Sequence, residues 1–159
     1  MAAFEYRQAE ELRAAFVRNR VRCLFIGKAG AIILGFPDTT QDVDVFPQKD
    51  SENGSRLVAA LREIGFNVSP EREGDIVRGK DFVELKDGPF DVDLVFAPDG
   101  IETFNDAWAR RVEVDGFDVC NIDDIIASKV AANRRKDRES LERLREFREY
   151  LQRPMNNVE

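Results

Sequence analysis

Residues 23–46 read CLFIGKAGAIILGFPDTTQDVDVF, and this stretch decides the fold. The apolar run at residues 24–26 predicts a short buried strand, and Gly27 predicts a turn directly after it. Residues 28–34 then predict a short helix, and a loop leads on to a second strand at residues 42–46. A strand, a glycine turn, a helix and a further strand in this order are typical of an α/β fold.

Two carboxylates lie in the second expected strand. Asp42 and Asp44 are two positions apart, so their side chains project from the same face, while Val43 and Val45 point into the core. Two neighbouring acids repel each other at neutral pH unless a cation lies between them. Carboxylate oxygens are hard ligands that suit Mg²⁺, so the pair predicts a divalent metal site.

Gly27 supplies the other half of the expected site. Backbone N–H groups at the start of a helix lack partners within the helix and, together with the helix dipole, attract phosphate. A phosphate-binding turn beside metal-binding acids is typical of phosphoryl or nucleotidyl transfer. Gly30-Ala31 offers a second register for this turn, but Gly27 is favoured because it directly follows the strand.

These residues resemble the signature of the DNA polymerase β-like nucleotidyltransferases: a hydrophobic strand, Gly-Gly or Gly-Ser, a spacer and Asp-x-Asp. Gly27-Lys28 stands in the glycine position, and residues 42–44 stand in the acid position. Gly35 and Thr40 match the form common in the small bacterial members. Lys28 departs from the usual serine, whose hydroxyl holds a phosphate, but its ammonium can pair with phosphate as a point charge.

A further pair of acids lies in the apolar segment FDVDLVF at residues 90–96. Acids inside an apolar strand are costly to bury unless they are paired or bound to metal. The resembling family has a third carboxylate on a strand next to Asp-x-Asp, which implies that Asp93 completes the metal site, with Asp91 as the second choice. The alternative interpretation is an edge strand with one face in water.

The C-terminal part is basic, because residues 129–148 contain eight basic and four acidic side chains. One interpretation is a solvated helix with ion pairs such as Glu139–Arg143. The other is a basic ridge, including Lys129 on the outer edge of its helix and residues 134–136, that receives a triphosphate or an RNA end. For the helix alone we favour the solvated interpretation, and for Lys129 and residues 134–136 the basic ridge.

Residues 124–144, DIIASKVAANRRKDRESLERL, also resemble the late segment of small AbiEii-like nucleotidyltransferases. Lys129, Arg135, Lys136 and Asp137 match that pattern, and Asp137 is expected to cap the last helix. The resemblance implies that Lys129 or Lys136 neutralises charge as pyrophosphate leaves.

Composition excludes several other classes. The chain of 159 residues contains no histidine, which rules out Ser-His-Asp and Cys-His hydrolases and zinc sites with histidine ligands. A net charge of −7 argues against nonspecific nucleic-acid binding by the whole surface. Cys23 and Cys120 are expected to be reduced core residues. The sequence shows neither a membrane-spanning apolar run nor a secretory signal, so a cytoplasmic protein without membrane association is expected.

The remaining expected elements complete the domain. Helices are expected at residues 4–18, 51–64 and 103–110, with Ser51 as an N-cap, and a strand is expected to start at Phe66 and Val68. Residues 70–80 are charged and lack periodicity, which predicts a surface loop or the tip of a hairpin. Short strands at residues 81–86, 111–114 and 117–120 are also expected.

The prediction is a single nucleotidyltransferase-like domain over residues 1–159, of class α/β (α+β). It has a core at about residues 20–120 and a C-terminal helical pair at about residues 121–151. A small mixed, twisted sheet is expected, with helices mainly on one face.

The resemblance implies transfer of a nucleoside monophosphate from an NTP to an acceptor hydroxyl, with Mg²⁺ or Mn²⁺ as cofactor. The implied metal ligands and catalytic residues are Asp42, Asp44 and Asp93. The implied phosphate-binding residues are Gly27, Lys28, Thr40, Lys129 and Lys136. The acceptor alternatives are tRNA or another RNA in a toxin–antitoxin setting with a cognate antitoxin, an antibiotic, or a partner protein. The non-enzyme alternative is a degenerate member that binds nucleotide or a partner without turnover.

Overall fold

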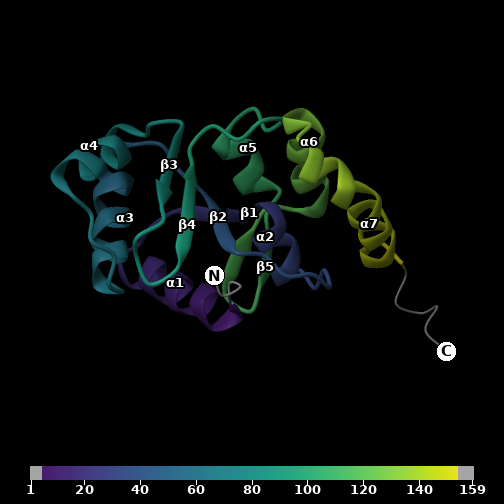
Figure 1. Cartoon of the computed structure of the whole chain (residues 1–159), viewed down its shortest axis with the longest axis horizontal. Helices are drawn as coiled ribbons and strands as arrows, with labels where there is room; N and C mark the ends of the chain where they lie inside the picture. Colours follow the sequence, from purple (N-terminus) through teal and green to yellow (C-terminus); the bar gives the residue numbers. More distant parts are fainter. Residues whose placement is uncertain (1–4, 154–159) are drawn as a thin grey trace.

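A six-stranded open sheet in the order β3-β4-β2-β1-β6-β5 forms the middle of the computed structural model, which describes residues 5–153 (Figure 1). The strands β2 and β4 run parallel, as do β1 and β6, and the other neighbours run antiparallel, so the predicted mixed sheet is confirmed. The strand bounds are β1 Cys23–Ile26, β2 Asp42–Pro47, β3 Phe82–Leu85, β4 Asp91–Val95, β5 Val112–Val114 and β6 Phe117–Val119.

Seven helices surround this sheet within residues 5–153. Their bounds are α1 Tyr6–Arg18, α2 Gly27–Ile33, α3 Ser51–Glu63, α4 Pro70–Arg78, α5 Phe104–Ala109, α6 Ile122–Ala132 and α7 Arg135–Leu151. The helices α6 and α7 form the predicted C-terminal pair at one end of the molecule (Figure 1). None of the helices over residues 5–153 combines the length and the apolar character that crossing a bilayer requires.

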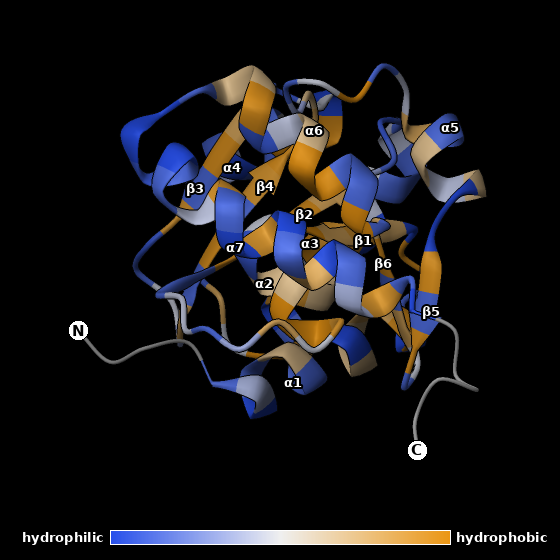
Figure 2. Cartoon of the chain, turned by 90° about the vertical axis from the view of Figure 1, so that its right-hand side faces the viewer, coloured by the Kyte–Doolittle hydropathy of each residue, from blue (hydrophilic) through white to orange (hydrophobic). Residues whose placement is uncertain are grey.

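Apolar cores lie on both faces of the sheet, which corrects the prediction that helices pack mainly on one face. On one face, Phe25, Val43 and Val45 pack with apolar residues of α1 and α3. On the other face, Leu24 and Phe46 pack with apolar residues of α5, α6 and α7. Strand β1 is buried along its whole length because it lies between two helical layers, and Figure 2 shows the hydrophobic colour gathered there in the middle of the fold. Cys23 and Cys120 are buried, as predicted.

Residues 70–80 were predicted as a loop, and this prediction is wrong because residues 70–78 form α4. The start of the helix is capped by Ser69, whose side chain accepts a hydrogen bond from the N–H of Arg72, and Pro70 occupies the first turn. Gly79 ends the helix with φ +72°. Ile76 is the one buried residue of this helix, so the sequence shows no apolar periodicity there. The sequence features that indicate the helix are its capping residues.

Residues 66–68 do not form the expected strand. The side chains of Phe66 and Val68 are buried, but their backbone belongs to the connection between α3 and α4. Their burial explains the apolar pattern, because both side chains pack in the core although their backbone forms no strand.

Two expected helix caps also differ by one to three positions. The cap of α3 is Asp50 rather than Ser51, since the Asp50 carboxylate accepts a hydrogen bond of 2.7 Å from the N–H of Asn53. The cap of α7 is Arg134, and Asp137 is the third residue of that helix. The Asp137 carboxylate reaches back and accepts a hydrogen bond of 3.2 Å from the Arg134 N–H, as in a capping box.

Candidate metal and phosphate site

The three predicted acids converge at the junction of β2 and β4. These strands are parallel neighbours whose register sets Asp44 beside Asp93 and Asp42 beside Asp91. Asp42, Asp44 and Asp93 can each offer one carboxylate oxygen such that these oxygens all lie within 4.8 Å of one another. The strand β4 is interior rather than an edge, because β3 covers its other side. The geometry therefore favours Asp93 over Asp91, which does not line the neighbouring cleft.

One oxygen of this cluster has no hydrogen-bond partner. Asp93 Oδ1 is buried and accepts no hydrogen bond, and the ammonium of Lys86 lies 3.6 Å away from it. A buried acceptor without a partner costs about 1–3 kcal/mol. Burial, followed by the charge of Asp44, raises the pKa of Asp93 to about 8. A divalent cation would satisfy this oxygen and offset the repulsion, so the residues present fit a metal.

The other two carboxylates differ in their electrostatic environment. Burial raises the pKa of Asp44, and the charge of Asp42 adds to this effect. Burial also opposes ionisation of Asp42, but the hydrogen bond from Lys86, at 3.0 Å, a hydrogen bond with Asp93 and the charges of Lys86 and Lys136 together lower the pKa of Asp42. Without a divalent cation, the cluster therefore favours ionised Asp42 and disfavours full ionisation of the other two acids.

Gly27 brings the backbone directly against this cluster. It follows β1, whose last residue, Ile26, pairs with Asp44 in the sheet. Gly27 has φ +64°, and a Cβ atom at this position would lie 2.5 Å from Asp44 Oδ2. Glycine is required here for both reasons, because other residues are strained at this φ and their Cβ would overlap the carboxylate.

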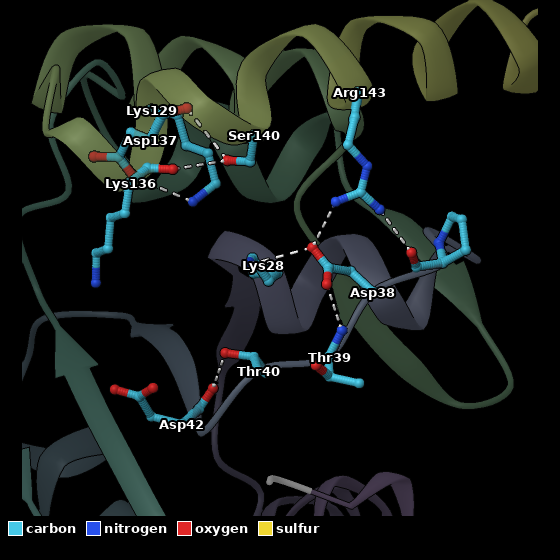
Figure 3. A network of polar contacts seen from close by, with 11 residues as sticks. Lys28, Asp38, Thr39, Thr40, Asp42, Lys129, Lys136, Asp137, Ser140 and Arg143 are labelled. Carbon is cyan, nitrogen blue, oxygen red and sulfur yellow. Dashed lines mark hydrogen bonds and ion pairs between the residues drawn. The ribbon is translucent and has the colours of Figure 1, made fainter.

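Lys28 lies on the first turn of α2 and is already paired. Its Nζ atom is 3.3 Å from Asp38 Oδ2, and the same oxygen lies 3.2 Å from Arg143 of α7 (Figure 3). Burial works against ionisation of Asp38, but the hydrogen bond from the Thr39 N–H and the charge of Lys28 lower its pKa. The expected Glu139–Arg143 pair is not formed in the described residues, since Arg143 instead binds Asp38 and the carbonyl oxygen of Pro37.

A basic wall, which we define as Lys129 of α6, Lys136 of α7 and Arg134 in the link between them, lines the same cleft as the acids. Lys129 was expected on the outer edge of its helix, but its side chain is only 12% exposed and its Nζ lies 3.3 Å from Asp137 Oδ1. Burial lowers the pKa of Lys129. The fully buried Asp137 carboxylate also accepts a hydrogen bond of 2.7 Å from Arg134 Nε. Figure 3 shows Lys136 extending from α7 to the side of the cleft where Asp42 lies.

A single cleft of about 700 Å³ connects these groups. Its lining includes all the predicted site residues except the second choice Asp91, namely Gly27, Lys28, Thr40, Asp42, Asp44, Asp93, Lys129 and Lys136. Thr40 contributes through its hydroxyl, which donates a hydrogen bond of 3.2 Å to the carbonyl oxygen of Asp42. The sequence interpretation missed Asp38 and Lys86, whose partners are distant in the chain, and it did not predict that Asp137 pairs with Lys129.

A scan against models of known protein families found no match to this chain, and a search of curated proteins found no significant relative. The chemistry of the cleft is therefore the basis for a functional assignment. The cleft combines a carboxylate cluster that fits a divalent cation with cations that can neutralise phosphate.

Proposed function

We propose that this protein is a metal-dependent nucleotidyltransferase that moves a nucleoside monophosphate from an NTP to an acceptor hydroxyl. The observation that carries the proposal is the convergence of the carboxylates of Asp42, Asp44 and Asp93, of which Asp93 Oδ1 is buried without a hydrogen bond. These carboxylates would hold Mg²⁺ or Mn²⁺. A bound metal would supply charge neutralisation at the phosphates and a lower pKa for the attacking hydroxyl.

The other residues of the cleft have matching roles in this reaction. Lys129 and Lys136 would neutralise the charge that develops as pyrophosphate leaves, and Gly27 and Lys28 would hold the β and γ phosphates. Lys28 would exchange its contact with Asp38 for phosphate. The acceptor oxygen bonds to the α-phosphorus while the bond from that phosphorus to the bridging oxygen breaks. Asp93 would orient the acceptor hydroxyl and accept its proton.

The proposal is tested by following label from each α-labelled NTP into RNA, protein and small acceptors with Mg²⁺ or Mn²⁺. We expect Asp44→Ala to lower transfer by about 100-fold or more, because the metal site would lose one of its three carboxylate ligands. The matched control is Asp87→Asn, which removes an exposed carboxylate outside the cleft. Undiminished transfer by the folded Asp44→Ala protein would rule out the assignment.

A second candidate function is nucleotide or partner binding without turnover. Two observations favour it: the Lys28 ammonium is paired with Asp38, and the Lys86 ammonium already contacts Asp42 and Asp93. Calorimetry with ATP, CTP, GTP and UTP, with and without Mg²⁺, separates the two candidates. Nucleotide binding without incorporation into any acceptor supports this second candidate.

The acceptor class is a separate question within the first proposal. The basic wall suits the phosphates of an RNA end. A toxin role predicts growth arrest when the protein is expressed, and relief of that arrest by a cognate antitoxin. Label recovered in tRNA, in a protein or in an aminoglycoside would identify the acceptor directly.

A further inference from the structure

An aromatic side chain lies open in the same cleft. Phe82 is the first residue of β3, its side chain lines the cleft, and the residue is 47% exposed. Of the large apolar residues that are exposed within residues 5–153, Phe82 is the one that lines this cleft. A half-exposed aromatic side chain on an edge strand leaves apolar surface in water and favours association with other chains. Because the ring lies in the same cleft as the polar site, it offers an apolar surface to a bound ligand.

The surroundings of Phe82 form a distinct corner of the cleft. Phe82 pairs with Val95 across the β3–β4 ladder, and Val95, Ala97 and Pro98 line the cleft beside it. We define the apolar corner as these four residues. The acids, the basic wall and the apolar corner give the cleft three regions of different chemistry. A nucleotide has the same three requirements, namely a metal at its phosphates, cations around them and an apolar surface for its base.

The spacing along the sheet is compatible with one ligand reaching two of these regions. Glu84 is the direct partner of Asp93, and Phe82 lies two residues from Glu84 on the same face of β3. Ordinary strand spacings place the Cα atoms of Phe82 and Asp93 about 8 Å apart. A nucleotide whose phosphates lie at the acids can therefore extend its base over the Phe82 ring.

We propose that Phe82 is the platform on which the nucleobase of the bound nucleotide stacks. This inference rests on the proposed function, because it takes an NTP as the ligand. Every nucleobase has a π face, so stacking on Phe82 contributes affinity for all four NTPs, with polar contacts left to distinguish them. The aromatic ring also excludes water from one side of the base.

The test compares a ligand that has a base with one that lacks it. We measure binding of ATP and of inorganic tripolyphosphate, both with Mg²⁺, by calorimetry for the wild-type chain and for Phe82→Ala, Phe82→Tyr and Val112→Ala. Val112 is the matched control, because it is the exposed first residue of β5 at the opposite edge of the sheet. Thermal unfolding confirms that each variant is folded.

We expect Phe82→Ala to weaken ATP binding by roughly five- to 150-fold and to leave tripolyphosphate binding unchanged. Phe82→Tyr should retain ATP binding, and Val112→Ala should bind both ligands as the wild type does. Equal weakening of both ligands by Phe82→Ala, or no weakening of ATP, would overturn the inference. A wild-type protein that binds ATP but transfers nothing contradicts the proposed function alone, whereas one that binds no nucleotide overturns both.

Discussion

The Nζ atom of Lys86 lies 3.0 Å from Oδ2 of Asp42, so the cluster of acids has a built-in counter-ion. Lys86 directly follows β3 and also lies 3.6 Å from Asp93 Oδ1 and 4.0 Å from Glu84. Burial opposes its charged form, yet the hydrogen bond to Asp42 and the charge of Asp93 raise the pKa of Lys86. A divalent cation that binds Asp42 and Asp93 must therefore share these carboxylates with Lys86 or displace it.

Replacing Lys86 by methionine should tighten Mg²⁺ and Mn²⁺ binding. The Lys86 side chain is 42% exposed, and an ion pair this open is weak, so we expect a gain of roughly three- to tenfold in metal affinity. Calorimetric titration of metal into the two proteins measures the difference. Lys80→Met is the matched control, because Lys80 pairs with Asp75 outside the cleft. Unchanged or weaker metal binding by Lys86→Met would contradict the competition.

Metal affinity should rise with pH up to about pH 8. The pKa of Asp93 is raised to about 8 by burial and by Asp44, so below that pH a bound metal must expel a proton. One proton per metal corresponds to roughly tenfold weaker apparent binding for each pH unit below the pKa. Titrations at pH 6, 7 and 8, in buffers of different ionisation enthalpy, measure both the affinity and the proton release. Affinity that is constant between pH 6 and 8 would refute this expectation.

Gly27→Ala should destabilise the fold and disturb the metal site together. A residue other than glycine at φ +64° costs about 1–3 kcal/mol, and the added Cβ would overlap Asp44 Oδ2. Chemical denaturation measures the first effect and metal titration the second. Adding Asp44→Ala to the variant should recover part of the lost stability, because the overlap is removed while the backbone strain persists.

The matched control for this variant is Gly74→Ala. Gly74 lies in α4 with open space around its position, so alanine there should stabilise the protein by about 0.5–1 kcal/mol. A Gly27→Ala protein as stable as this control would show that the turn tolerates a side chain.

Asp137→Asn should destabilise the protein at neutral pH by about 3–5 kcal/mol. The variant removes the buried charge that pairs with Lys129 and Arg134 and leaves the Lys129 ammonium without its partner. Glu139→Gln is the matched control and should change stability by less than about 1 kcal/mol, since its pair with Arg135 is exposed. Denaturant unfolding of the three proteins at pH 7 measures both values.

The ion pairs of Asp137 with Lys129 and Arg134 also predict how the stability of the protein depends on pH. Burial works against ionisation of Asp137, but Arg134 and Lys129 lower its pKa below the usual value of 3.8. A lowered pKa in the folded state stabilises the protein above pH 3.8, and this contribution is lost as pH falls through the folded pKa. The stability difference between wild type and Asp137→Asn should therefore shrink in acid, and a constant difference down to pH 2 would contradict it.

The acid pair was predictable because a two-residue period in a strand decides which side chains share a face. Asp42 and Asp44 needed only this rule. The choice of Asp93 over Asp91 rested on the family resemblance, and the carboxylate of Asp93 does lie with those of Asp42 and Asp44. The same rule applies to β3, where Val83 is buried and Phe82, its neighbour in the strand, faces the opposite side and is exposed.

Other features had no such signal. The contacts of Lys86 with Asp42 and of Asp38 with Arg143 join residues that are 44 and 105 positions apart. Charged residues this distant pair only after the sheet and the last helix have packed. The inward direction of Lys129 follows similarly from the packing of α6 against α7.

The Asp38 contacts make one side of the cleft stiffer than the other. Through Lys28 and Arg143, this carboxylate cross-links α2, the segment before β2 and α7 into one unit. The opposite side carries β3, which has a neighbouring strand on one side only. A bulky ligand would therefore be accommodated by an outward shift of β3, the edge strand, while the cross-linked side keeps its shape.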